Sequence, residues 1–286
     1  MLPSGYITNS PGDSSASERS HWGWAALVLP YMEQGPLWGA LEVGRRSLSD
    51  NLLTTGGRTG LTTPLPGLVC PSDTGPALND FNEAYADDPS DASAAHYNRL
   101  VTSNGSDRIA IAKSNYVGVA CSSMSTTPPV DPGPYGPATG VLFQNSATSS
   151  RDITDGGSNT LMVGERCFRI ADLNVGAANA LGFSSTVNTP GTSGGIKTAG
   201  MCVLGIPYEG INTWLGSRVH QPRGFHSTHS GGAQFVLCDG SVRFLSQTID
   251  YNAITIPSSS LTNGKWVDSV LERLCAKNDG QTIGEF

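Results

Sequence analysis

The chain contains few charged residues and no long apolar run. Asp, Glu, Lys and Arg make up 14% of its 286 residues, and the net charge is −7. No Lys/Arg cluster is present, which argues against a nucleic-acid partner or an anionic membrane surface. The longest apolar run, Ala25 to Leu29, is far shorter than the ~20 residues that a bilayer span needs. No signal peptide is recognisable. These absences leave a cytosolic protein, or an exported one whose leader and anchor precede Met1.

The familiar cysteine and catalytic motifs are also missing. The six cysteines contain no C-x-x-C pair, which argues against a zinc ribbon or a thioredoxin-like site. They leave two alternatives, one to three disulfides or buried free thiols. No P-loop, H-E-x-x-H or dinucleotide fingerprint occurs. Gly191 to Gly195 matches G-x-S-x-G, but Pro190 precedes it and a strand does not, so we interpret it as a flexible loop. No enzyme is predicted.

Glycine (35 residues) and proline (18 residues) are abundant, which is typical of a protein rich in turns and strands. The length suits one domain, residues 1–286, with a sizeable core. Two polar stretches, 74–112 and 171–218, are interpreted as loop insertions. Helices are predicted at His21–Met32 and Pro36–Leu41, strands at Ser114–Cys121 and Thr160–Phe168, and an amphipathic helix at Val267–Cys275. Helices first, then an antiparallel sheet with long insertions, then a short helix define an α+β fold class.

A hairpin is predicted near the C-terminus, because Asp239-Gly240 lies between two runs of strand-favouring residues. A two-residue turn would place Phe235 opposite Phe244 and Leu237 opposite Val242. All four side chains would then lie on one face and belong to the core.

Several residues are candidates for metal binding. His226, His229 and Asp239 have zinc-ligand chemistry, but nine residues of predicted strand separate His229 from Asp239. At about 3.3 Å per residue this places them roughly 25–30 Å apart, so we interpret Asp239 as a turn former and His229 as a structural residue. Asp152 and Asp155 resemble a calcium loop only loosely. Val163 stands where the bidentate Glu of an EF-hand is required, so an irregular calcium site or a hydrogen-bonded Asp-Gly turn remains. No cofactor is predicted, with calcium as the alternative.

Glu165 and Arg166 are adjacent on a predicted strand, so their side chains face opposite sides and form no evident catalytic pair.

The order of several short segments is more specific than any of them alone. It closely resembles the large planctomycete family of prepilin-type proteins of unknown function, whose C-terminal hallmark of a His, nine residues and Asp-Gly is met by His229, Asp239 and Gly240. The segments are Leu2–Ile7, Trp22–Trp24, Leu29–Gln34, Val69–Asp73, Ser114–Gly118, Gly140–Phe143, Arg151–Glu165, His229–Phe244 and Gly280–Phe286.

The resemblance implies a head domain similar to type IV pilins and type II secretion pseudopilins. Such proteins begin with a prepilin peptidase site and a long apolar helix, which this sequence lacks, so Met1 is expected to be a truncated start. The sheet would then be uncovered on one side, and an apolar groove is expected there, exposed or filled by another chain. The implied protein is exported and non-enzymatic, and it assembles with itself or with other pilin-like subunits through that helix.

Two other functions are weighed against this one. A soluble ligand-binding module at the cell surface, with carbohydrate as the candidate ligand, is favoured if Trp214 and Trp266 are exposed in loops, because aromatic faces suit sugar stacking. A metal-dependent hydrolase would require His226, His229 and Asp239 to converge.

Overall fold

The computed structural model describes residues 1–8, 20–82, 98–103, 107–121, 138–184, 199–207, 209–213, 221–252, 267–284 and 286. The α-helices are α1 (Trp24–Val28), α2 (Gly35–Leu41), α3 (Leu48–Leu52), α4 (Thr55–Leu61) and α7 (Val270–Cys275). The strands are β1 (Tyr6–Ile7), β2 (Ser20–Gly23), β3 (Leu78–Asn79), β4 (Ile111–Ser114), β5 (Tyr116–Val119), β6 (Leu161–Glu165), β7 (Arg169–Ile170), β8 (Leu173–Asn174), β9 (Ala178–Asn179), β10 (Gly182–Ser184), β11 (Leu204–Gly205), β12 (Gly232–Leu237) and β13 (Val242–Ser246). Short 3₁₀ turns are η1 (Leu29–Met32), η2 (Pro66–Leu68), η4 (Ser150–Asp152), η5 (Gly157–Asn159), η6 (Gly200–Cys202) and η7 (Gln221–Arg223).

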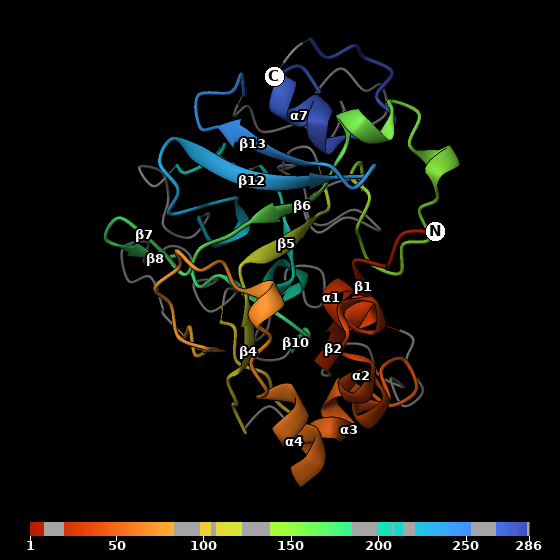
Figure 1. The fold of residues 1–286 in the computed structure, drawn as a ribbon, viewed down its shortest axis with the longest axis vertical. Helices are drawn as coiled ribbons and strands as arrows, with labels where there is room; N and C mark the ends of the chain where they lie inside the picture. Colours follow the sequence, from red (N-terminus) through yellow and green to blue (C-terminus); the bar gives the residue numbers. More distant parts are fainter. Residues whose placement is uncertain are drawn as a thin grey trace, which may run out of the picture.

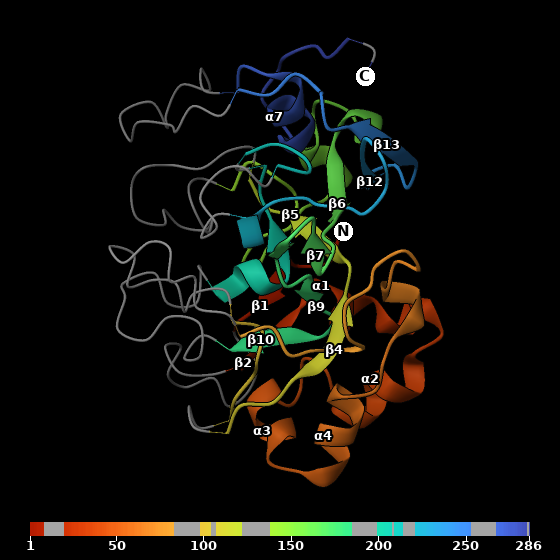
Figure 2. The ribbon, with the colours of Figure 1, turned by 90° about the vertical axis from the view of Figure 1, so that its left-hand side faces the viewer.

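The centre of the molecule is a five-stranded sheet in the order β11-β5-β6-β12-β13. Its neighbours are antiparallel except for β11, which runs parallel to β5. A smaller antiparallel sheet, β1-β2-β10, lies between the central sheet and the helices α2, α3 and α4 (Figures 1 and 2). Few helices with mainly antiparallel sheets confirm the α+β class.

Helix α7 covers one face of the five-stranded sheet. Its Leu271 and Leu274 are fully buried and belong to the same apolar cluster as Phe235 and Leu237 of β12. The helix begins after Ser269, which forms a capping box with Glu272. The predicted helix Val267–Cys275 is therefore present, but it starts three residues later.

The N-terminal helix prediction was partly wrong. Residues His21, Trp22 and Gly23 of the predicted helix His21–Met32 belong to strand β2, and the helical turns begin at Trp24. Strand β2 is paired on both sides, with β1 and β10, and Trp22 is completely buried. These tertiary contacts override the local helical spacing.

Strands occur within the described parts of the two stretches that were interpreted as loop insertions. The 74–112 stretch contains β3 and the start of β4, and the 171–218 stretch contains β8 to β11. Strand β10 pairs with β2, and β11 forms the edge of the central sheet. These strands therefore join parts of both stretches to the sheets.

The hairpin of β12 and β13 exists, but the predicted register is wrong by one residue. Val236 lies opposite Val242, and Gln234 lies opposite Phe244. Phe235 and Leu237 are buried as expected, whereas Val242 and Phe244 are 61% and 46% exposed.

The cause of this shift is a three-residue loop, Cys238 to Gly240. Gly240 N donates to Leu237 O and Leu237 N donates to Ser241 O, and Gly240 has a φ of +87°. Because side chains alternate along a strand, one extra loop residue moves Val242 and Phe244 to the opposite face.

All six cysteines are free thiols, and five of them are buried. The buried-thiol alternative therefore holds in this structure, without a disulfide. Burial raises the pKa of the Cys238 thiol to about 12. Among the described helices, none is long and apolar enough to cross a membrane.

Candidate functional site

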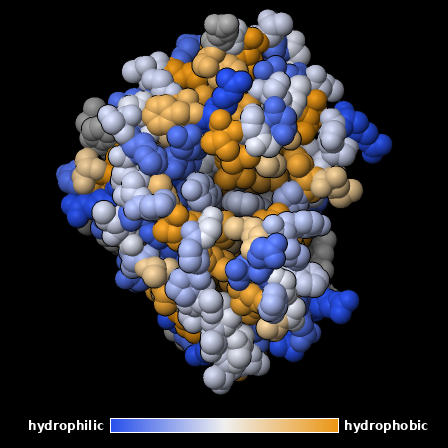
Figure 3. Space-filling model, viewed as in Figure 1, coloured by the Kyte–Doolittle hydropathy of each residue, from blue (hydrophilic) through white to orange (hydrophobic). Residues whose placement is uncertain are grey.

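The face of the central sheet opposite α7 forms an apolar groove of about 550 Å³. Strand pairing places Tyr116 beside Glu165, and Val163 beside Val236, which in turn lies beside Val242. These five side chains share one face of the sheet and line the groove. Trp24 and Met32 of the N-terminal helical turns form part of the opposite wall. Figure 3 shows hydrophobic residues around a hollow in this face of the molecule. The structure thus has an apolar groove on this face of the sheet.

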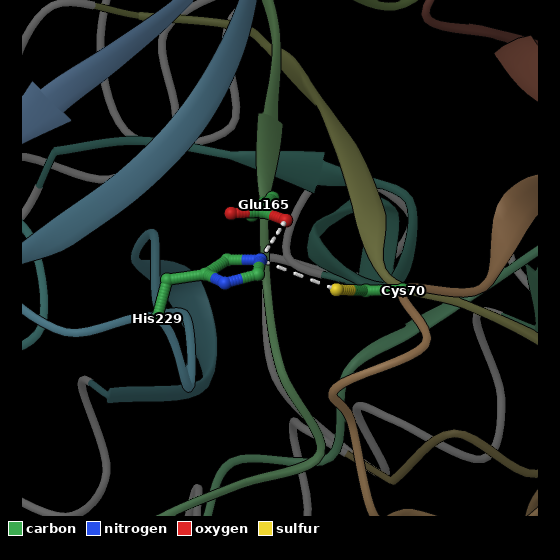
Figure 4. Close-up of side chains that lie close together, drawn as sticks. All are labelled: Cys70, Glu165 and His229. Atoms are coloured by element: carbon green, nitrogen blue, oxygen red, sulfur yellow. Dashed lines mark hydrogen bonds and ion pairs between the residues drawn. The ribbon is translucent and has the colours of Figure 1, made fainter.

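Three side chains with metal-ligand chemistry meet in this groove. His229 Nε2 lies 3.4 Å from Cys70 Sγ and 3.4 Å from Glu165 Oε1. One ligand atom from each residue lies within 4.8 Å of the other two. Figure 4 shows the three side chains pointing toward one another. Cys70 and Glu165 are buried, whereas the His229 side chain is 37% exposed. We call Cys70, Glu165 and His229 the groove cluster.

Cys70 is positioned by Asn115, which stands between β4 and β5. Asn115 Oδ1 accepts a hydrogen bond from Cys70 N, and its Nδ2 donates to Asp73 Oδ2 and to Arg166 O. Asp73 is buried with Lys113 in an ion pair, and its Oδ1 accepts from Phe168 N. Buried charges persist when they are paired and hydrogen-bonded in this way. The loop after η2 is therefore fixed against β4 and the end of β6.

Glu165 is held by the neighbouring strand. Its Oε2 accepts a hydrogen bond of 2.7 Å from Gln234 N of β12, which leaves Oε1 directed at His229. Arg166 follows immediately but its side chain is completely buried in the interior. The two adjacent side chains thus have different hydrogen-bond partners.

His229 stands in the short segment that leads into β12. Its backbone N donates to Ser227 Oγ, and Ser227 N donates to Asn212 Oδ1. Thr228 Oγ1 donates to Ser72 O in the Cys70 loop, which joins the two segments. The ring is therefore brought to the groove by a backbone that is fixed on both sides.

Tyr116 lies beside the groove cluster in the groove. Burial raises the pKa of its hydroxyl above the ordinary value, and the nearby Cys70 and Glu165 raise it further. Its phenol is therefore a neutral, half-buried group at physiological pH.

The metal set considered from the sequence is not brought together. His226 is buried, and its backbone pairs with that of Arg166 in an isolated parallel β-bridge. Asp239 lies in the hairpin turn, where its Oδ1 accepts from Ser241 N and Ser241 Oγ. Although all three residues are described, neither His226 nor Asp239 joins His229 in a group of ligand atoms. The structure places Asp239 as a turn former, and those hydrogen bonds lower its pKa.

The two calcium candidates have backbone partners. Asp152 forms a capping box with Ser149, and hydrogen bonds from Ser149 lower the pKa of its carboxyl. Asp155 accepts hydrogen bonds from Asp279 N and Gly280 N and so fixes the C-terminal segment. Trp214, Trp266 and the Gly191–Gly195 loop lie outside the described residues.

Sequence reasoning did not bring Cys70 or Glu165 to the site. Cys70 follows a short 3₁₀ turn, and Glu165 ends β6, so no spacing along the chain joins them to His229. The signal that was available is that Val69–Asp73, the segment ending at Glu165 and the His229 box each carry part of the resemblance. The structure shows that these three segments meet.

The fold and groove cluster define an α+β protein with an open, apolar sheet face and a small polar group of side chains within it. The chain belongs to a protein family of unknown function, DUF1559, whose model matches residues 1–252. No curated protein matches the chain, and no solved structure does.

Proposed function

We propose that this chain is a head domain of the pseudopilin or type IV pilin kind, displayed at the cell envelope of a bacterium of the planctomycete type. Its role in this proposal is non-enzymatic: the head is exported and assembles through an apolar helix joined ahead of Met1. The observation that carries the proposal is the apolar groove on the sheet face opposite α7.

The lining of the groove suits an apolar helix. Its walls are the sheet face on one side and Trp24 and Met32 on the other, and its lining is mainly apolar. Val242 at one edge is 61% exposed, which is unfavourable for an aliphatic side chain in water. In both ribbon views the N-terminus lies at mid-height, between the central sheet and helices α2–α4 (Figures 1 and 2).

The proposal is tested by joining an apolar helix of the pilin type ahead of Met1 and placing a photo-crosslinking residue at Val242. Crosslinks to the helix are expected at Val242, because it lines the groove. Leu53, which is 68% exposed at the end of α3, is the control position. Electron microscopy and light scattering on the same detergent-solubilised samples measure whether oligomers or filaments depend on the helix.

Crosslinks to the helix from Val242 but not from Leu53, together with helix-dependent oligomers, support the proposal. A monodisperse monomer with and without the helix, and no enrichment of crosslinks at Val242, would eliminate it. The carbohydrate-binding alternative depends on Trp214 and Trp266, and nothing in the described residues favours it.

A further inference from the structure

We propose that Cys70, Glu165 and His229 bind one zinc ion, with the fourth coordination position open to the groove. This site lies in the groove proposed for the helix, but zinc binding does not depend on the helix, and it uses none of the other metal candidates of the sequence. Thiolate, imidazole and carboxylate are the three ligand types that protein zinc sites combine.

The spacing of the three side chains fits a tetrahedral ion. Zn–S, Zn–N and Zn–O bonds of about 2.3, 2.05 and 2.1 Å at the tetrahedral angle give S···N of about 3.6 Å and N···O of about 3.4 Å. The corresponding distances are 3.4 Å from Cys70 Sγ to His229 Nε2 and 3.4 Å from His229 Nε2 to Glu165 Oε1. Two of the three ligand pairs therefore lie within a few tenths of an ångström of the tetrahedral spacing, and the third pair, Cys70 Sγ and a carboxylate oxygen of Glu165, lies within 4.8 Å.

The contacts fit a shared ion better than a catalytic triad. In a Cys-His-acid triad the thiol faces one ring nitrogen and the acid orients the other. Here both Cys70 Sγ and Glu165 Oε1 approach the same nitrogen, Nε2 (Figure 4). A single ring nitrogen has one hydrogen or one lone pair and cannot serve both groups linearly. A cation between the three atoms satisfies all of them at once.

Neighbouring residues orient the ligand side chains by hydrogen bonds, as the surroundings of protein metal sites do. Gln234 N donates to the second oxygen of Glu165, and Asn115 Oδ1 accepts from Cys70 N, so both ligands are oriented by neighbours. The half-exposed His229 ring gives the ion a path from solvent. All three residues line the groove, so the fourth position is available to water or to a group in the groove. On binding, the Cys70 thiol transfers its proton to buffer and the thiolate coordinates the ion, without any redox change.

The test is a titration of chelator-treated protein with zinc chloride alone, by calorimetry, with elemental analysis of the dialysed product. One equivalent is expected to bind. Each of Cys70→Ser, Glu165→Gln and His229→Gln is expected to weaken binding by at least about 100-fold, the upper end of what the loss of an outer-shell partner costs. Cys238→Ser and Asp239→Asn, a cysteine and a carboxylate of the hairpin turn, are matched controls that should bind as the parent does.

Two further measurements separate this site from weak surface binding. Cobalt substituted for zinc should give a thiolate charge-transfer band that Cys70→Ser lacks. Zinc at a hundred times its Kd should raise the Tm of the parent by about 5–10 °C and leave that of His229→Gln unchanged. Because His229 is half exposed, this variant should fold even if the other two do not. Binding of no zinc by the parent, or full affinity in Cys70→Ser or His229→Gln, overturns the proposal.

Discussion

Arg166 shows how a single residue organises the interior behind the groove cluster. Its guanidinium is completely buried and donates to the carbonyl oxygens of Met201, Leu204, Arg223 and Gly224. Burial lowers its pKa well below the ordinary value. Because these carbonyls belong to η6, β11 and the segment before β12, one side chain joins three parts of the chain that are distant in sequence.

We expect Arg166→Met to reduce the free energy of unfolding by about 3–5 kcal/mol, because several buried carbonyls lose their donor. Arg166→Lys should recover only part of this, since an ammonium group cannot reproduce the planar fork of donors. Denaturant unfolding measures both. Arg151→Met, at a side chain that is 90% exposed, is the control and should change stability by less than about 0.5 kcal/mol. A loss of that small size in Arg166→Met would mean that water replaces the guanidinium.

At the residue scale, the role of a side chain could be predicted from the sequence only where its partners are close to it along the chain. Asp239 was predicted as a turn former because Asp239-Gly240 lies between two runs of strand-favouring residues, and in the structure its partner Ser241 is two residues away. Cys70 and Glu165 could not be joined to His229, because their meeting depends on Asn115 and Gln234, which fix separate segments side by side. Such contacts leave no periodic pattern.

Among the elements, the β12–β13 hairpin depends most on one backbone conformation. Gly240 has a φ of +87°, and a Cβ added there would meet nothing within 4 Å. Gly240→Ala should therefore lose about 1 kcal/mol through backbone strain alone. Gly39 is its counterpart in α2, where a Cβ also meets nothing but the backbone is helical. Gly39→Ala should gain about 0.5–1 kcal/mol, because alanine favours the helix.

Denaturant unfolding of the two alanine variants measures both the expected loss and the expected gain in the free energy of unfolding. If Gly240→Ala and Gly39→Ala changed the free energy of unfolding by the same amount, the three-residue loop would be contradicted. The positive φ of Gly240 requires a loss of stability at Gly240 and a gain at Gly39.

Element type was easier to predict than register. The C-terminal helix followed from apolar spacing, and its true start is marked by Ser269 and Glu272, an S-x-x-E pattern that the sequence displays. The hairpin register failed because Cys238 and Asp239 donate their backbone hydrogens to Thr160 and Gly157 outside the hairpin. Those bonds hold an extra residue in the loop, and the Asp-Gly pair alone does not predict them.

At the scale of the whole molecule, two buried groups of the described residues, Glu272 and His21, are expected to change the stability with pH in opposite directions. Burial raises the pKa of Glu272 to about 7 and lowers that of His21 to about 4. For Glu272 the folded state holds its proton more tightly than the unfolded one, so its contribution to stability falls as the pH rises from about 4.5 to 7. For His21 the unfolded state binds the proton more tightly, so its contribution rises with pH from about 4 to 6.5.

The two slopes offset each other between about pH 4.5 and 6.5, so Tm should vary little there in the parent protein. Glu272→Gln keeps an oxygen for the Ser269 cap and removes one titration, so its Tm should fall on acidification through this window as His21 gains a proton in the unfolded state. Thermal unfolding at several pH values, with a chelator present to keep the groove cluster free of metal, measures this. Glu42→Gln, at an exposed glutamate paired with Arg46, is the control and should follow the parent. If the Tm of Glu272→Gln also follows that of the parent, then the contributions of Glu272 and His21 do not oppose each other. The pH dependence of stability would then arise elsewhere in the fold.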